Sequence, residues 1–158
     1  MRGIMKYVNR IHRSMGVVYN NRLREYGINH CQHPYILLIC QYPGITQEEL
    51  ARSVCVNKSN VTRQLASLEG EGYLTRRPDE DDKRLMRVYP TEKMEALLPH
   101  VREVMGDWNA LLLEGFSEEE RAKLISMLEI ITIRATEAAH STLRGSERSS
   151  GEKEGGSR

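Results

Sequence analysis

The chain has 158 residues, 39% of them hydrophobic, which is enough for one domain with an apolar core. The formal net charge is only +1, which excludes binding of nucleic acid through bulk charge alone. The longest apolar run, 35–40, is too short to span a bilayer, and no secretory leader precedes it, so we expect a cytoplasmic protein without a membrane segment. Three widely spaced cysteines indicate reduced thiols rather than a disulfide framework.

The first two predicted helices cover residues 3–26 and 30–41. In the first, apolar residues recur at alternating spacings of four and three, at Ile4, Val8, Ile11, Met15 and Val18. Gly27 ends this helix. The second helix is apolar nearly all round, which predicts a central position in the fold, and Pro43-Gly44 ends it.

Two short helices joined by a tight turn are predicted next. Thr46 and Glu49 have the spacing of a capping box, so a helix begins at 46, and the run 54–56 is too poor in helix formers to continue it. Asn57 is the N-cap of a second helix that extends to about Glu71. Its buried stripe is formed by Val61, Leu65 and Leu68.

The opposite face of this second helix is polar and free of bulky side chains. It carries Ser59, Asn60, Arg63 and Ser67, with Thr62 on its flank and Lys58 at its start. Such groups suit a helix that lies in the major groove of DNA, although an ordinary solvated face has a similar composition. The segment that follows favours the DNA-binding interpretation.

That segment predicts a β-hairpin, with strands at 73–77 and 84–89 joined by 78–83. The strands carry four arginines, Arg76, Arg77, Arg84 and Arg87. A helix-turn-helix followed by an arginine-rich hairpin is a winged helix-turn-helix, in which the wing can place a basic side chain in the minor groove. The acids at 79–82 would repel phosphate unless they turn inward to pair with Arg77, Lys83 or Arg84.

Two further helices are predicted after the wing. The first carries a stripe formed by Met94, Leu98, Val101, Met105, Trp108 and Leu112. Pro99 lies inside it and is expected to kink it, and Gly115 ends it. A capping box of Ser117 and Glu120 begins the last helix, which reaches about Leu143. Residues 144–158 contain no apolar side chain and are predicted to be disordered.

These segments resemble the MarR family of bacterial transcriptional regulators from residue 4 to about 143. The matching residues are Asn57-Lys58-Ser59 with Val61-Thr62-Arg63, Leu68-Glu69 with Gly72-Tyr73-Leu74, Arg76-Arg77-Pro78-Asp79 with Asp81-Asp82-Lys83-Arg84, and Thr91-Glu92-Lys93. The resemblance implies that Arg84 enters the minor groove, that Asp82 braces it, and that the helix 57–67 reads the major groove. The sequence departs from the family at Met94, and from common helix-turn-helix turns at Cys55, where glycine is usual.

The predicted fold is mainly α with a small β-hairpin wing: a winged helix-turn-helix core at 29–90, flanked by long dimerisation helices at 1–28 and 91–143. The apolar stripes of the long helices have more surface than the winged helix-turn-helix core can cover, which favours a homodimer over a monomeric bundle. Candidate DNA-binding residues are Lys58, Ser59, Asn60, Thr62, Arg63, Ser67, Arg77, Asp82, Lys83 and Arg84.

We therefore expect a sequence-specific, ligand-responsive repressor that binds a pseudo-palindromic operator in double-stranded DNA. The resemblance implies a small aromatic or phenolic effector in a crevice between the dimer helices and the reader. The candidate effector-binding residues, assigned from position, are His12, Tyr19, His33 and Tyr35.

Other classes of function were weighed against this one. Zinc ligands could come from His30, Cys31 and His33, with His12, His100 and Cys40 elsewhere, but their spacing matches no closed site, so no metal or cofactor is expected and a zinc-responsive regulator stays an alternative. An enzyme is not expected, because no phosphate loop, paired acidic motif or nucleophile elbow is present. A protein-interaction module that does not bind DNA is the remaining alternative.

Overall fold

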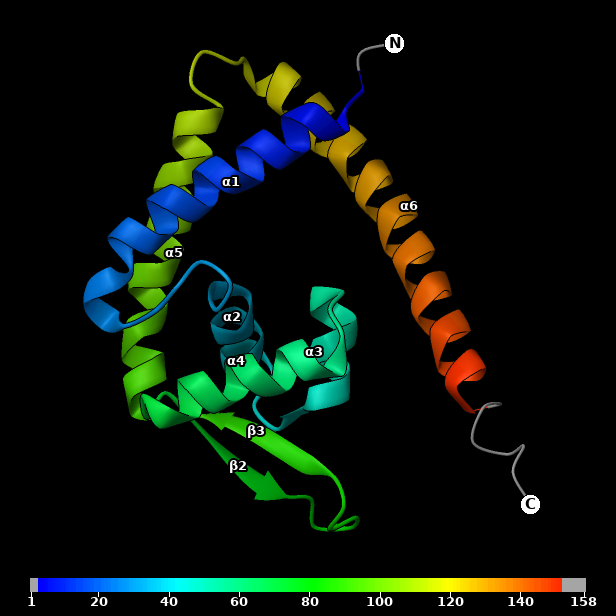
Figure 1. Cartoon of the computed structure of the whole chain (residues 1–158). Helices are drawn as coiled ribbons and strands as arrows, with labels where there is room; N and C mark the ends of the chain where they lie inside the picture. The colour runs from blue at the N-terminus through cyan, green and yellow to red at the C-terminus, as the bar shows by residue number, and fades with distance from the viewer. Residues whose placement is uncertain (1–2, 152–158) are drawn as a thin grey trace.

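The computed structural model describes residues 3–151, with side chains described up to Thr142 (Figure 1). In chain order the elements are α1 (Met5–Arg22), the 3-10 helix η1 (Arg24–Tyr26), α2 (His33–Gln41), β1 (Ile45–Thr46), α3 (Gln47–Val54), α4 (Lys58–Gly70), β2 (Leu74–Pro78), β3 (Met86–Pro90), α5 (Glu92–Leu112) and α6 (Glu118–Gly151). The predicted fold, mainly α with a small winged sheet, is confirmed.

The helix-turn-helix forms where the caps predicted it. The amide of Glu49 donates to the Thr46 hydroxyl at 3.2 Å, and the amide of Thr46 donates to the Glu49 carboxylate at 2.8 Å, which completes the capping box of α3. The amide of Asn60 donates to the Asn57 side chain at 2.8 Å and caps α4. Between the two helices, Cys55 adopts a left-handed conformation with φ of 56°.

The sheet has three antiparallel strands in the order β1-β3-β2. Strands β2 and β3 form the predicted hairpin, with bounds that differ from the prediction by one or two residues. Strand β1 was not predicted, because two residues are too few to show an alternating pattern. Its pairing of Ile45 with Val88 places the start of the helix-turn-helix beside the wing.

The core lies between α2, α4, α5 and the base of the sheet. The residues with no exposed surface include Leu23, Ile36, Ile39, Leu50, Val61, Leu65, Leu68, Val88 and Met94. These buried residues include the whole predicted apolar stripe of α4. They also include Ile36 and Ile39 of α2, so the predicted central position of that helix is confirmed. Each buried aliphatic side chain contributes roughly 1.5–3 kcal/mol to stability.

The N-terminal half of α1 and all of α6 lie away from this core. In Figure 1, α6 runs beside the body of the molecule, and the start of α1 reaches the region where α6 begins. No described side chain of α6 is buried. On α1 the residues Ile4, Val8 and Ile11 of the predicted stripe are exposed, whereas Met15 and Val18 are half-buried.

The end of α1 and the start of α2 differ from the prediction. Helix α1 ends at Arg22, and residues 24–26 form a separate 3-10 turn before Gly27. Helix α2 begins at His33 rather than residue 30, because the amide of Asn29 donates to the Gln32 side chain at 2.9 Å and closes a turn.

Residues 144–151, predicted to be disordered, continue α6. Extending an existing helix costs far less than starting one, so a polar sequence can propagate it. The rest of the predicted disordered tail, 152–158, lies outside the described residues. Among the described residues, every helix is too short or too polar to cross a lipid bilayer.

Replacing Cys55 with glycine is expected to stabilise the fold relative to replacing it with alanine. Both variants remove the thiol, but only glycine relieves the left-handed strain, so Cys55→Gly should be more stable than Cys55→Ala by about 0.5–1 kcal/mol. Urea denaturation of both variants measures the difference. Equal stabilities would show that the turn carries no backbone strain.

Candidate nucleic-acid interface

The outward face of α4 is centred on Ser59 and Arg63. Both are exposed and lie opposite the buried stripe at 100° per residue, and the exposed Ala66 lies on the same face one turn beyond Arg63. Lys58, in the first turn, is exposed as well. The small side chains of Ser59 and Ala66 let the helix backbone approach a partner closely, with Arg63 as the long basic group.

Three of the predicted DNA-binding residues of α4 make hydrogen bonds within the protein. The Tyr35 hydroxyl donates to Asn60 Oδ1 at 3.4 Å, and Gln32 Nε2 donates to the Ser67 hydroxyl at 3.0 Å. The Thr62 hydroxyl donates to the carbonyl of Lys58 at 3.0 Å. Asn60 and Ser67 therefore lie on the flank of α4 that faces α2, a position that the helical period alone did not predict.

The wing is organised by Asp79, whose side chain lies inside the hairpin with 7% of the residue exposed. Its Oδ1 accepts from the amides of Asp81 at 2.9 Å and Asp82 at 3.0 Å, and its Oδ2 forms an ion pair with Arg87. The amide of Asp82, the Arg87 guanidinium and the amide of Asp81 lower the pKa of Asp79 from 3.8 to about 2.

Arg87 extends this network to the start of the helix-turn-helix. Its second nitrogen donates to the carbonyl of Gly44 at 2.9 Å, just before β1. The sequence predicts that the acids at 79–82 pair with Arg77, Lys83 or Arg84. Asp79 does turn inward, but it pairs with Arg87 instead, because residues 79 and 87 lie on opposite sides of the hairpin next to its turn.

Arg76 is also used within the protein. It forms an ion pair with Glu69 of α4, with Nε at 3.0 Å from the carboxylate. The Arg76 guanidinium lowers the pKa of Glu69, and the Glu69 carboxylate raises the pKa of Arg76. This pair holds β2 against α4.

The three remaining basic residues of the wing are Arg77, Lys83 and Arg84. Within the part of the chain that the structure describes, they form no ion pair. The Arg77 guanidinium lies 5.5 Å from the centroid of the Tyr89 ring. Asp82 accepts from the backbone amide of Arg84 at 3.0 Å, so it braces the backbone of that residue rather than its guanidinium.

The wing and the start of α4 share a surface hollow of about 230 Å³. It is lined by Gln47, Glu48, Lys58, Arg84, Leu85 and Met86. The structure thus brings together Lys58 and Arg84, two predicted DNA-binding residues that are far apart in sequence. A basic side chain from each of the two expected binding elements lines one concave surface.

The predicted effector residues gather between α1 and α2. The rings of Tyr19 and His33 meet edge to face with centroids 5.0 Å apart, and the ring of His12 lies 6.0 Å from that of His30. Tyr19 and Tyr35 are buried, and burial raises the pKa of both hydroxyls. Burial also lowers the pKa of His33.

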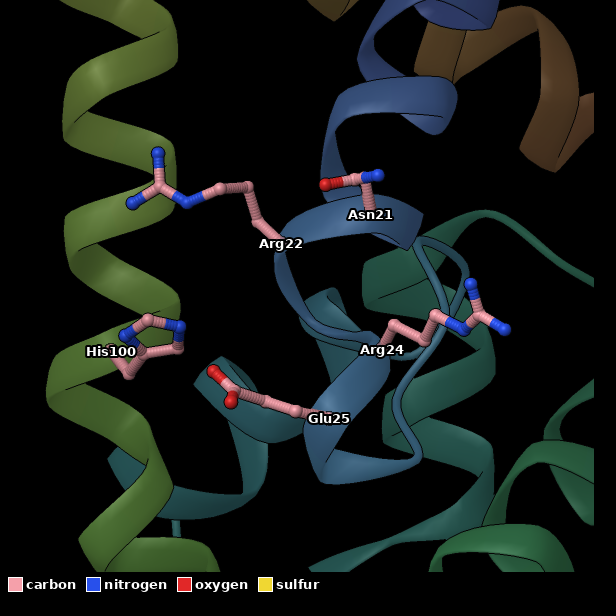
Figure 2. A pocket seen from close by; sticks show the side chains of 5 residues that line it. All are labelled: Asn21, Arg22, Arg24, Glu25 and His100. Atoms are coloured by element: carbon pink, nitrogen blue, oxygen red, sulfur yellow. The ribbon is translucent and has the colours of Figure 1, made fainter.

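A larger hollow, of about 610 Å³, lies between the end of α1, η1 and α5 (Figure 2). Its lining residues are Asn21, Arg22, Arg24, Glu25 and His100, so none of the four predicted effector residues lines it. In Figure 2 the side chains of Glu25 and His100 point toward each other, whereas Arg24 points away. Among the described residues, no group of three or more His, Cys, Asp or Glu side chains is placed to hold a metal ion.

Comparison with known proteins identifies relatives of this fold. A family model described as the MarR family matches residues 28–86. YybA of Bacillus subtilis (strain 168), named an uncharacterized HTH-type transcriptional regulator, is 28% identical over 128 residues, which cover 81% of this chain and 85% of that protein.

Two solved structures are similar over nearly their whole length. A MarR transcriptional regulator from Methanosarcina mazei Go1 has a TM-score of 0.81 at 28% identity and covers 85% of this chain and 97% of its own. A MarR family transcriptional regulator from Listeria monocytogenes, solved with a 26mer DNA, has a TM-score of 0.86 at 25% identity over 92% of this chain and 97% of its own.

Replacing Asp79 with asparagine is expected to destabilise the fold at neutral pH, whereas Asp81→Asn, at an exposed position, is expected to have little effect. Because folding depresses the pKa of Asp79, its contribution to stability is present above the unfolded-state pKa near 3.8 and is lost as the pH falls through about 2. The stability gap between the wild type and Asp79→Asn should therefore narrow over that range. Denaturation curves at several pH values measure it, and a gap that is independent of pH would contradict the assignment.

Proposed function

Because the chain belongs to the MarR family of winged helix-turn-helix transcriptional regulators, which bind DNA, we propose that it is a ligand-responsive repressor that binds a pseudo-palindromic operator as a homodimer. One observation supports the assignment of the DNA-binding surface. Among the described residues, Lys58 and Arg63 of α4 and Arg77, Lys83 and Arg84 of the wing form no ion pair, and Lys58 and Arg84 line the same hollow.

The proposed DNA contacts divide between the two grooves. Arg63 and Ser59 lie on the outward face of α4 and enter the major groove, where an arginine can donate two hydrogen bonds to guanine. Lys58 contacts phosphate near the start of α4. Arg84 enters the minor groove, with its backbone held by Asp82.

The other candidate residues take supporting parts in this proposal. Arg77 and Lys83 are exposed on the wing and neutralise phosphates on either side of the groove. Thr62 lies beside the exposed face, whereas Asn60 and Ser67 hold α4 against α2. Their replacement would alter the position of α4 rather than remove a base contact.

The homodimer is supported by the apolar surface of the long helices. Exposed apolar residues on α1 are Ile4, Met5, Tyr7, Val8, Ile11 and Val17, and those on α6 are Ile125, Met127, Leu128, Ile130, Ile131 and Ile133. A soluble monomer rarely exposes so many large apolar side chains on adjoining helices. We assign residues 1–28 and 91–143 to dimerisation and 29–90 to DNA binding.

The effector proposal follows from the contacts between α1, α2 and α4. An aromatic or phenolic molecule that separates Tyr19 from His33 would move α2, and Tyr35 of α2 is hydrogen-bonded to Asn60 of α4. Preferential binding of the molecule to one placement of α4 would change operator affinity. His12, exposed on α1 at the edge of this cluster, is the fourth residue assigned to the site.

Removing the charge of Arg84 or Arg63 is expected to weaken DNA binding in different ways. Arg63→Ala should cost about 1–3 kcal/mol on the specific sequence and relax specificity. Arg84→Ala should weaken binding and lower the salt slope by about one phosphate equivalent or less. Titrations of the DNA flanking the gene, at two salt concentrations with unrelated competitor DNA, measure both. The matched control is Arg102→Ala, an exposed arginine on α5, and unchanged affinity in both test variants would refute the assigned surface.

A charge placed on the apolar face of α6 is expected to dissociate the dimer. Ile131→Glu puts a carboxylate in the proposed interface, whereas Thr132→Glu puts one at the adjacent exposed polar position. Sedimentation equilibrium should show a dimer for the wild type and Thr132→Glu, and a shift toward monomer for Ile131→Glu. A wild type that sediments as a monomer would overturn the dimer proposal.

A further inference from the structure

The turn that precedes α2 places a thiol beside an imidazole. Cys31 is exposed, and its Sγ lies 3.4 Å from Nε2 of His30. The other ring nitrogen, Nδ1, lies 3.2 Å from Oδ1 of Asn20 on α1. A nucleophile, a base and a group that orients the base therefore follow one another in space.

The hydrogen bonds of His30 indicate which of its ring nitrogens carries the proton and which can act as a base. The backbone amide of His30 donates to Oδ1 of Asn20 at 2.7 Å, so this atom of Asn20 is an acceptor. Since Nδ1 of the ring meets the same oxygen, Nδ1 must carry the proton. In the neutral imidazole, Nε2 is then the acceptor and can take the thiol proton of Cys31.

Helix α1 also holds the plane of the ring. The buried Gly16 lies under the imidazole, and a Cβ at this position would meet three atoms of the His30 ring at 3.4–3.5 Å. Cys31 is held as well, because its amide donates to Oδ1 of Asn29 at 2.9 Å. Thiol and base are thus positioned by contacts from two segments of the chain.

We propose that Cys31 is a covalent modification site for soft carbon electrophiles, namely activated alkenes such as α,β-unsaturated carbonyl compounds, with His30 as its base. The thiol proton passes to Nε2, and the sulfur forms a bond to the β-carbon while the alkene π electrons move to the enolate. The imidazolium then returns the proton to the α-carbon. The net change is the addition of S–H across C=C, which needs no oxidant or reductant.

The other two cysteines lack this arrangement. Cys40 is half-buried, and burial raises the pKa of its thiol. Cys55 is half-buried too, with its Sγ 4.0 Å from Nε2 of His140. Cys40 also lies seven residues beyond the start of α2, about 10 Å along the helix, so it is too far to form a disulfide with Cys31. Addition to carbon needs no second thiol.

The modified turn is connected to α4 by the next residue. Gln32 is buried, accepts from the amide of Asn29 at 2.9 Å, and donates from Nε2 to the Ser67 hydroxyl at 3.0 Å. An adduct on Cys31 adds bulk to this turn at its contact with His30, and Gln32 connects the turn to α4. This regulatory consequence rests on the proposed DNA-binding function, whereas the modification site itself does not.

The site is tested with N-ethylmaleimide, an activated alkene, by following the alkylation of each cysteine through peptide mass spectrometry. Cys31 should react first in the wild type, at least about tenfold faster than an exposed thiol introduced on α3 by Ser53→Cys. His30→Gln should slow Cys31 by a similar factor at neutral pH, whereas His100→Gln, which alters a ring on α5 that packs against Tyr26, should not.

A rate profile against pH separates a base from a merely structural residue. The titratable groups facing the pair are His12 of α1, and His33 and Tyr35 of α2. The rates of the wild type and His30→Gln should converge at high pH, where the thiol ionises without help. Equal rates at neutral pH, or a wild-type Cys31 no faster than the introduced thiol, would overturn the proposal.

The coupling to α4 is tested separately by the DNA affinity of fully alkylated protein. Alkylation should weaken specific DNA binding at least about tenfold in the wild type and leave Cys31→Ser unchanged. Unchanged affinity of the alkylated wild type would overturn the coupling through Gln32. Failure of the unmodified protein to bind specific DNA would count against the proposed function, while the alkylation rates still test the site.

Discussion

The buried carboxylate of Asp79 is the constraint on which the DNA-binding surface depends. A carboxylate inside a hairpin is stable only when its oxygens are hydrogen-bonded, and here the amides of Asp81 and Asp82 and the Arg87 guanidinium bind it. Arg87 also donates to the carbonyl of Gly44, which leads into β1 and the capping box of α3. One side chain thus fixes the tip of the wing and ties the wing to the helix-turn-helix.

The basic residues of the wing fall into two groups, those paired with acids and those that are not. Arg76 and Arg87 are neutralised by acids and hold the hairpin to α4 and β1, whereas Arg77, Lys83 and Arg84 have no acidic partner among the described residues. The reader can therefore present basic groups although the chain has a net charge of only +1. The arrangement of charge, rather than its total, makes a DNA-binding surface physically reasonable.

Helix α2 connects the long helices to the reading helix. On one side, His33 packs against Tyr19 of α1, and on the other side Tyr35 and Gln32 are hydrogen-bonded to α4. A non-covalent ligand between α1 and α2 and a covalent adduct at Cys31 would act on the same helix. Both proposals thus act through α2. Coupling of either site to DNA binding through this helix requires that α4 has two discrete positions.

Much of the fold could be predicted from local sequence rules. The caps at Thr46 and Asn57, the stripe of α4 and the hairpin depend on residues within a few positions of one another. The partners of Asp79 and Arg87 and the two-residue strand β1 could not be predicted, because they depend on contacts between distant segments. For the same reason the helical period placed Asn60 and Ser67 on the reading face, whereas α2 binds both of them.

The role of Asp79 lies outside the part of the wing that the family resemblance stresses. The resemblance implies roles for Asp82 and Arg84, which lie at the exposed tip, and in the structure Asp82 accepts a hydrogen bond from the backbone amide of Arg84. An aspartate followed by three further acidic residues and paired across a hairpin with an arginine is a pattern that strand register could have revealed. The sequence predicted only the bounds of the strands, to within one or two residues, and not their register.

The most direct test of the central claim is selection of binding sites by the purified protein from a library of random double-stranded DNA. The account predicts an enriched inverted repeat whose half-site centres lie about one helical turn, or 10–10.5 base pairs, apart, because a two-fold dimer presents two copies of α4. Enrichment of no sequence above the starting library, or of a single motif without a repeat, would contradict it.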